Sequence, residues 1–381
     1  MKQYDYIFSG AGLSALMTVY KMTLSGKFRD KSILLIDKDA KKTNDRTWCF
    51  WENKPGNWET IVNKKWDSAL FANETFKRNL DLFPYQYKTI RGLDFYNLVF
   101  DTLSEQKNIT FVNEIVLSFE ENSNEVLVQT ETKTYSCGQL FNSILNLHEV
   151  ETQTDYPLLK QHFVGWFIKS DLPIFNPNLA TFMDFSVEQK GNTRFMYVLP
   201  TSETEALIEY TLFSHHHLEE TEYETEIQNY IQKLGISKYN ILEKERGSIP
   251  MTNFPFWKNN SVRLLNIGSA GGWTKASTGY TFKNADKKSD KLVGFLTSKS
   301  DLRKFHKINK FWFYDLLLLD ILDRKNETGA AIFSALFRKG NPALILKFLD
   351  EETSIWEDLQ VIWKCPKKLF VKSLFRRLFS V

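Results

Sequence analysis

The first 37 residues place the strongest constraint on the fold of this chain. The segment from Tyr4 to Ser9 has the composition of a short buried strand, and Gly10-Ala11-Gly12 interrupts it. Apolar residues then recur at helical spacing from Leu13 to Leu24, and a second strand pattern runs from Ser32 to Ile36. A strand, a helix and a second strand in this order predict a parallel sheet, so we expect an α/β fold.

The turn between the first strand and the helix fits the dinucleotide-binding pattern G-x-G-x-x-G/A. Gly10 allows the tight turn, Gly12 lets a pyrophosphate approach the backbone, and Ala15 lets the helix pack closely on the sheet. The phosphates would then bind to the free N–H groups at the start of the helix. Asp37 ends the second strand, where an acid binds ribose hydroxyls. No arginine follows it directly, so the pattern favours a dinucleotide without a 2′-phosphate, either FAD or NAD.

A second glycine-rich turn favours FAD. An apolar strand from Val262 to Ile267 precedes it, and a helix is expected from about Thr278. In many flavoproteins the helix after such a turn points its positive end at the flavin and favours the reduced form. Many of these turns carry Gly-Asp, but here Ser269 takes the place of the Asp, and the alternative is a plain strand–helix connection. The glycines predicted to bind the cofactor here are Gly268, Gly271, Gly272 and Gly279.

The length of the chain suits two structural units that share one body. We expect a discontinuous FAD-binding domain (1–100 and 240–300), a substrate-binding domain (101–239), and a helical cap with a membrane-associating tail (301–381). Strand patterns dominate the region from Phe163 to Phe213, and helical patterns continue beyond Asp301. The predicted fold class is therefore α/β: an FAD-binding Rossmann-like flavoprotein body with an inserted mixed β-sheet substrate domain and a C-terminal helical region.

Charge and metal-binding residue types limit the possible partners. The net charge of +3 is too small to indicate binding to nucleic acid. Cys49, Cys137 and Cys365 are scattered and odd in number, which fits a reducing compartment rather than a disulfide framework. The consecutive residues His215 to His217 would point to opposite faces of an extended segment, so we expect a solvated loop and no metal site.

The C-terminal segment has the pattern of a helix that lies on a membrane surface. Residues Lys364 to Val381 contain six basic residues and no acid. No basic and apolar leader pattern is visible at the start of the sequence, and no apolar run reaches the roughly 18 residues that cross a bilayer. We therefore expect a cytoplasmic protein that is peripheral on the inner membrane. On a helix, Phe370, Val371, Leu374, Phe375 and Leu378 share one face, and Lys372, Arg376 and Arg377 lie opposite.

Aromatic residues make up 15% of the chain, which suits either an aromatic core or a cavity for a large apolar ligand. Several aromatic-rich blocks, in this order along nearly the whole chain, resemble the bacterial lycopene beta-cyclases, a family of FAD-dependent enzymes. The blocks are Asp45–Trp51, Gln161–Trp166, Met183–Phe185, Phe195–Pro200, Leu207–Thr211, Gly247–Met251 and Thr278–Tyr280.

This resemblance implies an acid-catalysed cyclisation of the linear ends of lycopene to beta rings, giving beta-carotene via gamma-carotene. It implies reduced FAD as the active cofactor, NAD(P)H as the reductant, and no net redox change. Because lycopene is insoluble in water, the resemblance also implies that the enzyme collects it from the bilayer.

The resemblance assigns the essential carboxyl group to Glu209. Leu207 and Thr211 share its strand face, so an apolar neighbour would raise the pKa of this carboxyl and keep it able to donate a proton. The more familiar form of this block has a second acid, but the position is Tyr210 here. Asp184, on an adjacent predicted strand, is either a second carboxylate or a structural residue.

A carbocation also needs electron-rich neighbours that exclude water. The candidates are Trp48, Trp51, Trp166 and Tyr280, each of which could instead serve core packing. Two other functions use the same fold: a flavin-dependent isoprenoid hydroxylase or reductase, and a non-catalytic isoprenoid carrier. Neither of these needs Glu209.

Overall fold

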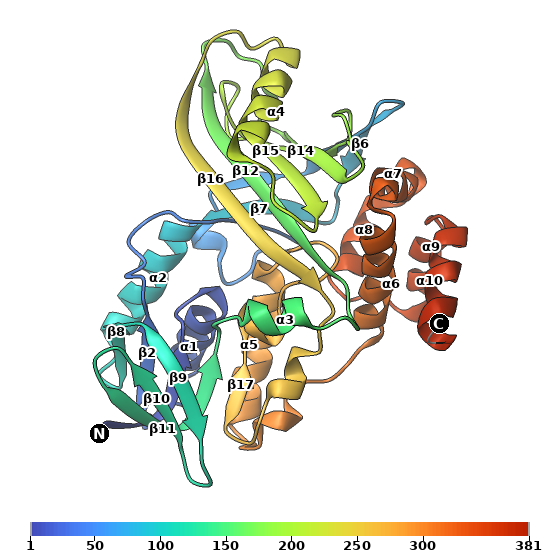
Figure 1. Ribbon diagram of the computed structural model, residues 1–381. Coiled ribbons are helices and arrows are strands. Elements are labelled where there is room, and N and C mark those ends of the chain that lie inside the picture. The colour runs from blue at the N-terminus through green and yellow to red at the C-terminus, as the bar shows by residue number, and fades with distance from the viewer. Residues whose placement is uncertain (1, 380–381) are drawn as a thin grey trace.

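The computed structural model describes residues 2–379. Over this range the chain forms two large β-sheets, a small three-stranded sheet and a C-terminal group of helices (Figure 1). The first sheet contains the N-terminal strand, the second lies at the opposite end of the molecule, and the C-terminal helices stand beside the second sheet (Figure 1).

The first sheet has the parallel arrangement that the N-terminal pattern predicts. Helices α1 (Leu13–Ser25), α2 (Gly92–Ser104) and α5 (Phe282–Leu296) contribute to one buried cluster with this sheet. The α/β fold predicted from the sequence is confirmed. The strands, in spatial order, are β8 (Ile109–Asn113), β2 (Ile33–Asp37), β1 (Lys2–Ser9), β11 (Thr134–Asn142), β10 (Val126–Thr130) and β9 (Val116–Glu121), and β17 (Leu264–Asn266) pairs with β11. Strands β8, β2, β1, β11 and β17 are parallel, whereas β9 and β10 are antiparallel.

The first sheet extends past residue 100, where the predicted N-terminal segment of the FAD-binding domain ends. Strand β8 pairs with β2, and β11 pairs with β1, so residues 109–142 belong largely to the first sheet. Local patterns indicate a strand but do not name its partner, and the partner decides to which sheet it belongs.

The second sheet is mixed, and it carries the segments with strand patterns between Phe163 and Phe213. Its strands, in spatial order, are β16 (Tyr239–Thr252), β12 (Leu158–Ser170), β15 (Glu205–Ser214), β14 (Thr193–Pro200), β13 (Leu179–Asp184), β5 (Ser68–Ala72) and β6 (Lys77–Asp81). All neighbours are antiparallel except β13 and β5. Helix α4 (Glu220–Lys233) packs on one face, and the C-terminal helices cover part of the other.

The small sheet and the remaining helices complete the body. The small sheet consists of β3 (Thr47–Glu52), β7 (Gln86–Arg91) and β4 (Lys64–Trp66). Helix α5 begins at Phe282, later than the expected Thr278, because Gly279 has a φ of 72° that an α-helix does not allow. The other helices are α3 (Leu147–Thr152), α6 (Lys310–Arg324), α7 (Gly329–Lys339), α8 (Pro342–Leu349), α9 (Ile355–Ile362) and α10 (Lys367–Phe379).

Candidate functional site

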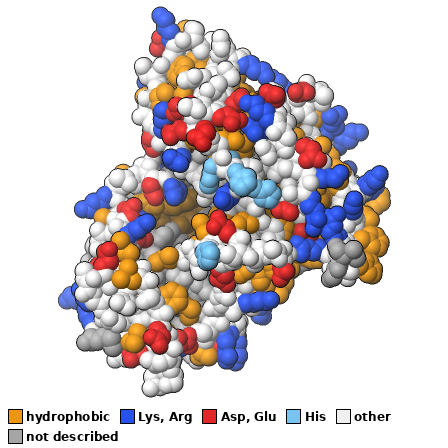
Figure 2. All heavy atoms as spheres, viewed as in Figure 1, with side chains coloured by type: hydrophobic (Ala, Val, Ile, Leu, Met, Phe, Trp, Pro, Cys, Tyr) orange, Lys and Arg blue, Asp and Glu red, His pale blue; other side chains and the backbone are white. Residues whose placement is uncertain are grey.

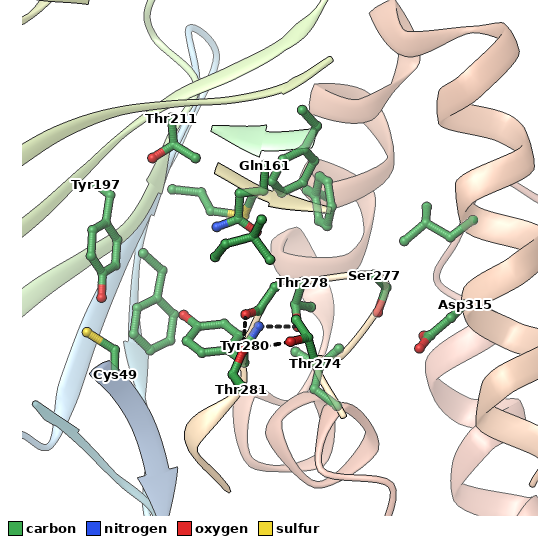
Figure 3. Close-up of a pocket in the computed structure, with 18 of the residues that line it drawn as sticks. Cys49, Gln161, Tyr197, Thr211, Thr274, Ser277, Thr278, Tyr280, Thr281 and Asp315 are labelled. Atoms are coloured by element: carbon green, nitrogen blue, oxygen red, sulfur yellow. Dashed lines mark hydrogen bonds between the residues drawn. The ribbon is translucent and has the colours of Figure 1, made fainter. Parts of the chain in front are cut away.

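A cavity of about 760 Å³ runs through the middle of the molecule. It begins at Gly12 and Leu13, at the start of α1, and ends between the C-terminal helices. Strands β3, β14 and β15 contribute one wall, and the turn from Thr274 to Thr281 contributes another (Figure 3). The cavity therefore joins the dinucleotide pattern, the second sheet and the C-terminal helices in one space.

Gly10 and Gly12 have different surroundings at the start of this cavity. Gly10 has a φ of 86°, and a Cβ there would lie 2.4 Å from Oγ of Ser143. A Cβ on Gly12 would meet no heavy atom within 4 Å. The N–H groups at the start of α1 receive no capping side chain, and Ala15 is fully buried in this helix. An open backbone before an uncapped helix fits a pyrophosphate group.

Asp37 lies at the end of β2, next to this turn. Its Oδ2 accepts a hydrogen bond of 2.6 Å from the N–H of Ala11, and Nζ of Lys41 lies 3.6 Å away. Lys41 itself lines the cavity. The carboxylate is thus fixed beside the turn, where the ribose of a dinucleotide would lie.

The second glycine turn packs directly on the first. A Cβ on Gly268 would lie 3.3 Å from Oγ of Ser14, in α1, and φ is 60° there. Gly272 has a φ of 64°, and a Cβ on Gly271 would lie 2.2 Å from the carbonyl oxygen of Asn266. Glycine is therefore required at all three positions by backbone geometry or close packing.

Gly279 brings the second sheet against the glycine-rich turn. A Cβ at this position would lie 2.3 Å from Oε1 of Gln161, in β12. Among residues 2–379, no donor reaches this buried Oε1, and both residues line the cavity (Figure 3). An unused acceptor beside the two glycine turns fits a ligand that carries N–H groups, as a flavin ring does.

Glu209 is a buried carboxyl group in the cavity wall, and it is only 7% exposed. The hydroxyl of Thr211 donates a hydrogen bond of 2.5 Å to Oε1. Burial, and then the negative charge of Glu245, raise the pKa of Glu209 well above its usual value, although Thr211 opposes this. The raised pKa favours the protonated form of Glu209, which can serve as an acid.

Tyrosine hydroxyls form a chain beside Glu209. Tyr197 pairs with Glu209 across β14 and β15, and its hydroxyl oxygen lies 2.5 Å from that of Tyr87. Tyr87 in turn lies 2.8 Å from the hydroxyl oxygen of Tyr280. Burial raises the pKa of all three, and it raises the pKa of the nearby Cys49 thiol to about 12 (Figure 3). This wall is therefore electron-rich but uncharged.

Of the candidate aromatic residues, Trp48, Trp51 and Tyr280 line the cavity. The rings of Trp51 and Tyr280 meet edge to face at 4.8 Å, and the indole N–H of Trp51 donates to the carbonyl of Leu346. Trp166 lies outside the cavity lining, in the cluster on the α4 face, with Nζ of Lys244 5.0 Å from its ring. Side chains alternate along β12, so Trp166 faces away when its neighbour Gly165 faces the cavity.

Two further residues of the sequence analysis lie away from the cavity. Asp184 accepts hydrogen bonds from the hydroxyl of Tyr230 and the N–H of Ser186, which indicates a structural role. Tyr210 points to the α4 face and accepts a hydrogen bond of 3.2 Å from Arg194. Because side chains alternate, an acid at position 210 would also point away from the cavity.

Glu245 is a carboxyl group near Glu209 that was not predicted from the sequence. Gly165 of β12 pairs with Glu209 on one side and with Glu245 of β16 on the other, so both carboxyl groups belong to one row across the sheet. The hydroxyl of Thr47 donates a hydrogen bond of 2.8 Å to Glu245. Burial raises the pKa of Glu245 to about 7, opposed by Thr47 and the positive charge of Arg91. A glycine inside a strand pattern often marks a close approach, and Gly165 was that signal.

The far end of the cavity lies between α9 and α10. Residues near the end of α9 and along α10 line it, namely Val361, Ile362, Cys365, Phe370, Val371 and Leu374. Apolar and basic side chains gather on the surface over these two helices (right side of Figure 2). Within residues 2–379, no helix is long and apolar enough to cross a membrane, and no three His, Cys, Asp or Glu side chains group as metal ligands.

Comparisons with known proteins identify the family of the chain and the fold that it shares. Residues 5–377 match the family model described as lycopene cyclase protein. A lycopene beta-cyclase from a Paracoccus species is 23% identical over 303 residues, which cover 76% of this chain and 73% of that protein. One from Pantoea ananas is 23% identical over 302 residues, covering 76% and 74%. The structure of a flavoprotein/dehydrogenase from Cytophaga hutchinsonii superposes with a TM-score of 0.64 at 10% identity, covering 99% of this chain and 100% of that one.

Proposed function

The chain belongs to the lycopene cyclase family, and from this premise we propose that it is a lycopene beta-cyclase that uses reduced FAD. The observation that carries the proposal is Glu209, a buried carboxyl with a raised pKa that lines a largely apolar cavity. The same cavity begins at the two glycine turns. One space thus holds an acid and a dinucleotide cradle, as this reaction requires.

The proposed reaction starts when Glu209 donates its proton to the terminal double bond of lycopene. The resulting tertiary cation is attacked by the π electrons of a double bond further along the chain, which closes the ring. The ring cation then loses a proton, which forms the ring double bond and leaves no net change in atoms or electrons. The same steps at the other end of gamma-carotene give beta-carotene, so the reaction is an isomerisation.

The residues of the cavity serve this reaction by keeping water away and by facing the cation. Trp51 and Tyr280 present aromatic surfaces, and the hydroxyl group of Tyr197 stays neutral, as does that of Tyr87, to which it is hydrogen-bonded. The residues that would hold FAD are Gly12, Asp37, Gln161 and the turn from Gly268 to Gly272. When bound and reduced by NAD(P)H, FAD would supply negative charge that stabilises the cation.

Pigment analysis of lycopene-accumulating bacteria that express the chain tests this function. We expect cyclised carotenes to replace lycopene, and the Glu209→Gln variant to lose at least about 100-fold in rate while keeping its flavin. If the wild type leaves lycopene unchanged although it is folded and contains FAD, the cyclase proposal fails. If Glu209→Gln converts lycopene as well as the wild type, Glu209 is not the acid, and hydroxylase or reductase activity should be assayed next.

We also propose that α9 and α10 dock on an anionic bilayer at the cytoplasmic face of the inner membrane. The docking surface comprises the exposed apolar residues Trp356, Leu359, Trp363, Val371, Phe375, Leu378 and Phe379 and the lysines Lys364, Lys367, Lys368 and Lys372. Trp356 and Trp363 are 78% and 69% exposed. The two nearby acids of α9 are already paired, Glu357 with Lys347 and Asp358 with Lys310, so the positive charge is left for lipid headgroups.

This surface surrounds the far end of the cavity, so lycopene would enter between α9 and α10 directly from the bilayer. Helix α10 contacts both the cavity and the surface, because Phe370 and Leu374 line the cavity while Phe375 and Leu378 are exposed. Arg377 is held by Asp320 of α6 and so adds little to the positive surface.

Sedimentation with lipid vesicles tests the docking surface. We expect binding to vesicles with anionic lipid, weaker binding to zwitterionic ones, and a decrease with salt. A double variant, Trp356→Ser and Trp363→Ser, should lose binding yet stay folded, whereas Leu117→Ser, at an exposed position of the first sheet, should bind as the wild type does. Unchanged binding of the double variant would show that the membrane contact lies elsewhere.

A further inference from the structure

Two carboxyl groups of the second sheet approach each other over one glycine. Gly165 of β12 lies between Glu209 of β15 and Glu245 of β16 in the pairing of the strands. A Cβ on Gly165 would lie 3.5 Å from Cβ of Glu209 and 3.2 Å from Cγ of Glu245. Cδ1 of Leu207 would lie closer still, at 2.9 Å. Both glutamate side chains therefore lie on the same face of the sheet and flank Gly165, which has no side chain of its own.

The two carboxyl groups have different hydrogen-bond partners. Glu245 accepts a hydrogen bond from Thr47, whose hydroxyl accepts one of 3.4 Å from Arg91. The hydrogen-bond donor to the Glu209 carboxyl is the hydroxyl of Thr211. Positive charge therefore reaches Glu245 and not Glu209, and Glu245 is the member of the pair that ionises first.

The other titratable groups around the pair reinforce this division. Around Glu209 they are Cys49 of β3 and the tyrosines Tyr87, Tyr197 and Tyr280, all of which stay neutral. Around Glu245 they are Arg46, Arg91 and Glu243, and Glu243 is itself paired with Arg91. The negative charge closest to Glu209 is thus that of Glu245.

We propose that Glu245 is a positioning residue whose negative charge, held across Gly165, keeps the proton on Glu209. The inference rests on the proposed role of Glu209 as the acid. Two like charges in one poorly solvated site are unfavourable, so an ionised Glu245 opposes the ionisation of Glu209. Tyr210, the next residue in sequence, points away from the cavity, towards the α4 face. The second carboxyl group near Glu209 is that of Glu245, on β16.

Infrared titration measures the protonation of Glu209 without turnover. The band of its protonated carboxyl is identified by its loss in Glu209→Gln. In Glu245→Gln we expect the pH midpoint of this band to fall by about one unit or more, because the opposing charge is gone. The alkaline limb of the cyclisation rate should shift in the same direction. Glu245→Asp, which keeps the charge, should shift less.

Glu205→Gln is the matched control. Glu205 lies on the same strand and the same face as Glu209, but it is solvent-accessible and paired with Lys169. Its loss should leave the midpoint unchanged. An unshifted midpoint in folded Glu245→Gln, or an equal loss of rate at every pH, would overturn the proposal.

The wild type offers a second test if Glu245→Gln does not fold. Ionisation of Glu245 near pH 7 should change the frequency of the protonated Glu209 band. A band that does not respond between pH 6 and 8, a window about one unit either side of that value, overturns the coupling. If the band responds but the wild type does not cyclise lycopene, the coupling stands and the proposed function fails.

Discussion

Gly10 and Gly12 are two residues apart, yet their substitution should affect different properties. Gly12 has a φ of −77°, which any residue adopts, and open space where a Cβ would be. We therefore expect Gly12→Val to fold with the stability of the apoprotein and to weaken FAD binding by at least about tenfold, a loss of about 1.4 kcal/mol. Flavin absorbance of the purified variant measures this.

Gly10→Val is the contrasting variant. Gly10 has a φ of 86° and lies close to Ser143, so a side chain at this position is unfavourable in the folded state. We expect a loss of about 2 kcal/mol in the free energy of unfolding. Urea denaturation of the two apoproteins compares them. Full flavin content in Gly12→Val would show that the pyrophosphate does not pass this turn.

Glu209 and Glu245 show what the sequence can and cannot say about a site. The family resemblance predicted Glu209 as the acid and predicted the strand that carries it. In the structure that carboxyl group lies in the cavity wall. Glu245 belongs to β16, which was not recognised as a strand because its sequence is rich in charged residues. Glu245 lies close to Glu209 because both pair with Gly165 of β12. Pairing across three strands is a property of the sheet and cannot be obtained from any one segment.

At the scale of the elements, the sequence predicts best those helices and strands that are determined by residues within the element itself. The β1–α1–β2 unit has the expected order because apolar periodicity and glycines mark it. The same holds for strands β12 to β15 and for the helices after Asp301. Strand β16 is an edge strand that contains four consecutive charged residues, Glu243 to Arg246, and it was not predicted as a strand. Its stability comes from pairing with β12, which is a tertiary effect.

Helix α10 should depend on one ion pair with α6. Arg377 makes two hydrogen bonds to Asp320, which is only 4% exposed. Arg377→Ala would leave this buried carboxylate without its partner, and we expect a loss of about 2 kcal/mol in the free energy of unfolding. Urea denaturation followed by tryptophan fluorescence measures the change.

Arg376→Ala is the control for this prediction, because the adjacent side chain removes the same charge from α10 without touching Asp320. It should change the free energy of unfolding by less than about 0.5 kcal/mol. Equal effects of the two substitutions would indicate that net charge, and not the pair with Asp320, holds α10 in place.

At the scale of the whole molecule, the buried carboxyl pair of Glu209 and Glu245 should lower the stability of the folded protein. Glu209 and Glu245 have raised pKa values in the folded state, whereas the unfolded chain ionises them near pH 4.5. Between these values the folded protein binds more protons than the unfolded chain, so its stability falls as pH rises from about 4.5 towards 7 and beyond. The stabilisation that comes from protonating Glu209 and Glu245 is fully present only below the pKa of these groups in the unfolded chain.

Glu245→Gln should therefore make the protein more stable at pH 8 and less active there. A pKa raised to about 7 in a partly solvated site corresponds to about 2 kcal/mol. We expect the free energies of unfolding of wild type and variant to differ little at pH 4.5 and by up to this amount at pH 8. Urea denaturation at several pH values measures both curves, with Glu205→Gln as control. If the stability of wild type and variant changed with pH in the same way, ionised Glu245 would not destabilise the folded protein. Its carboxylate would then be better solvated than its place beside Gly165 indicates.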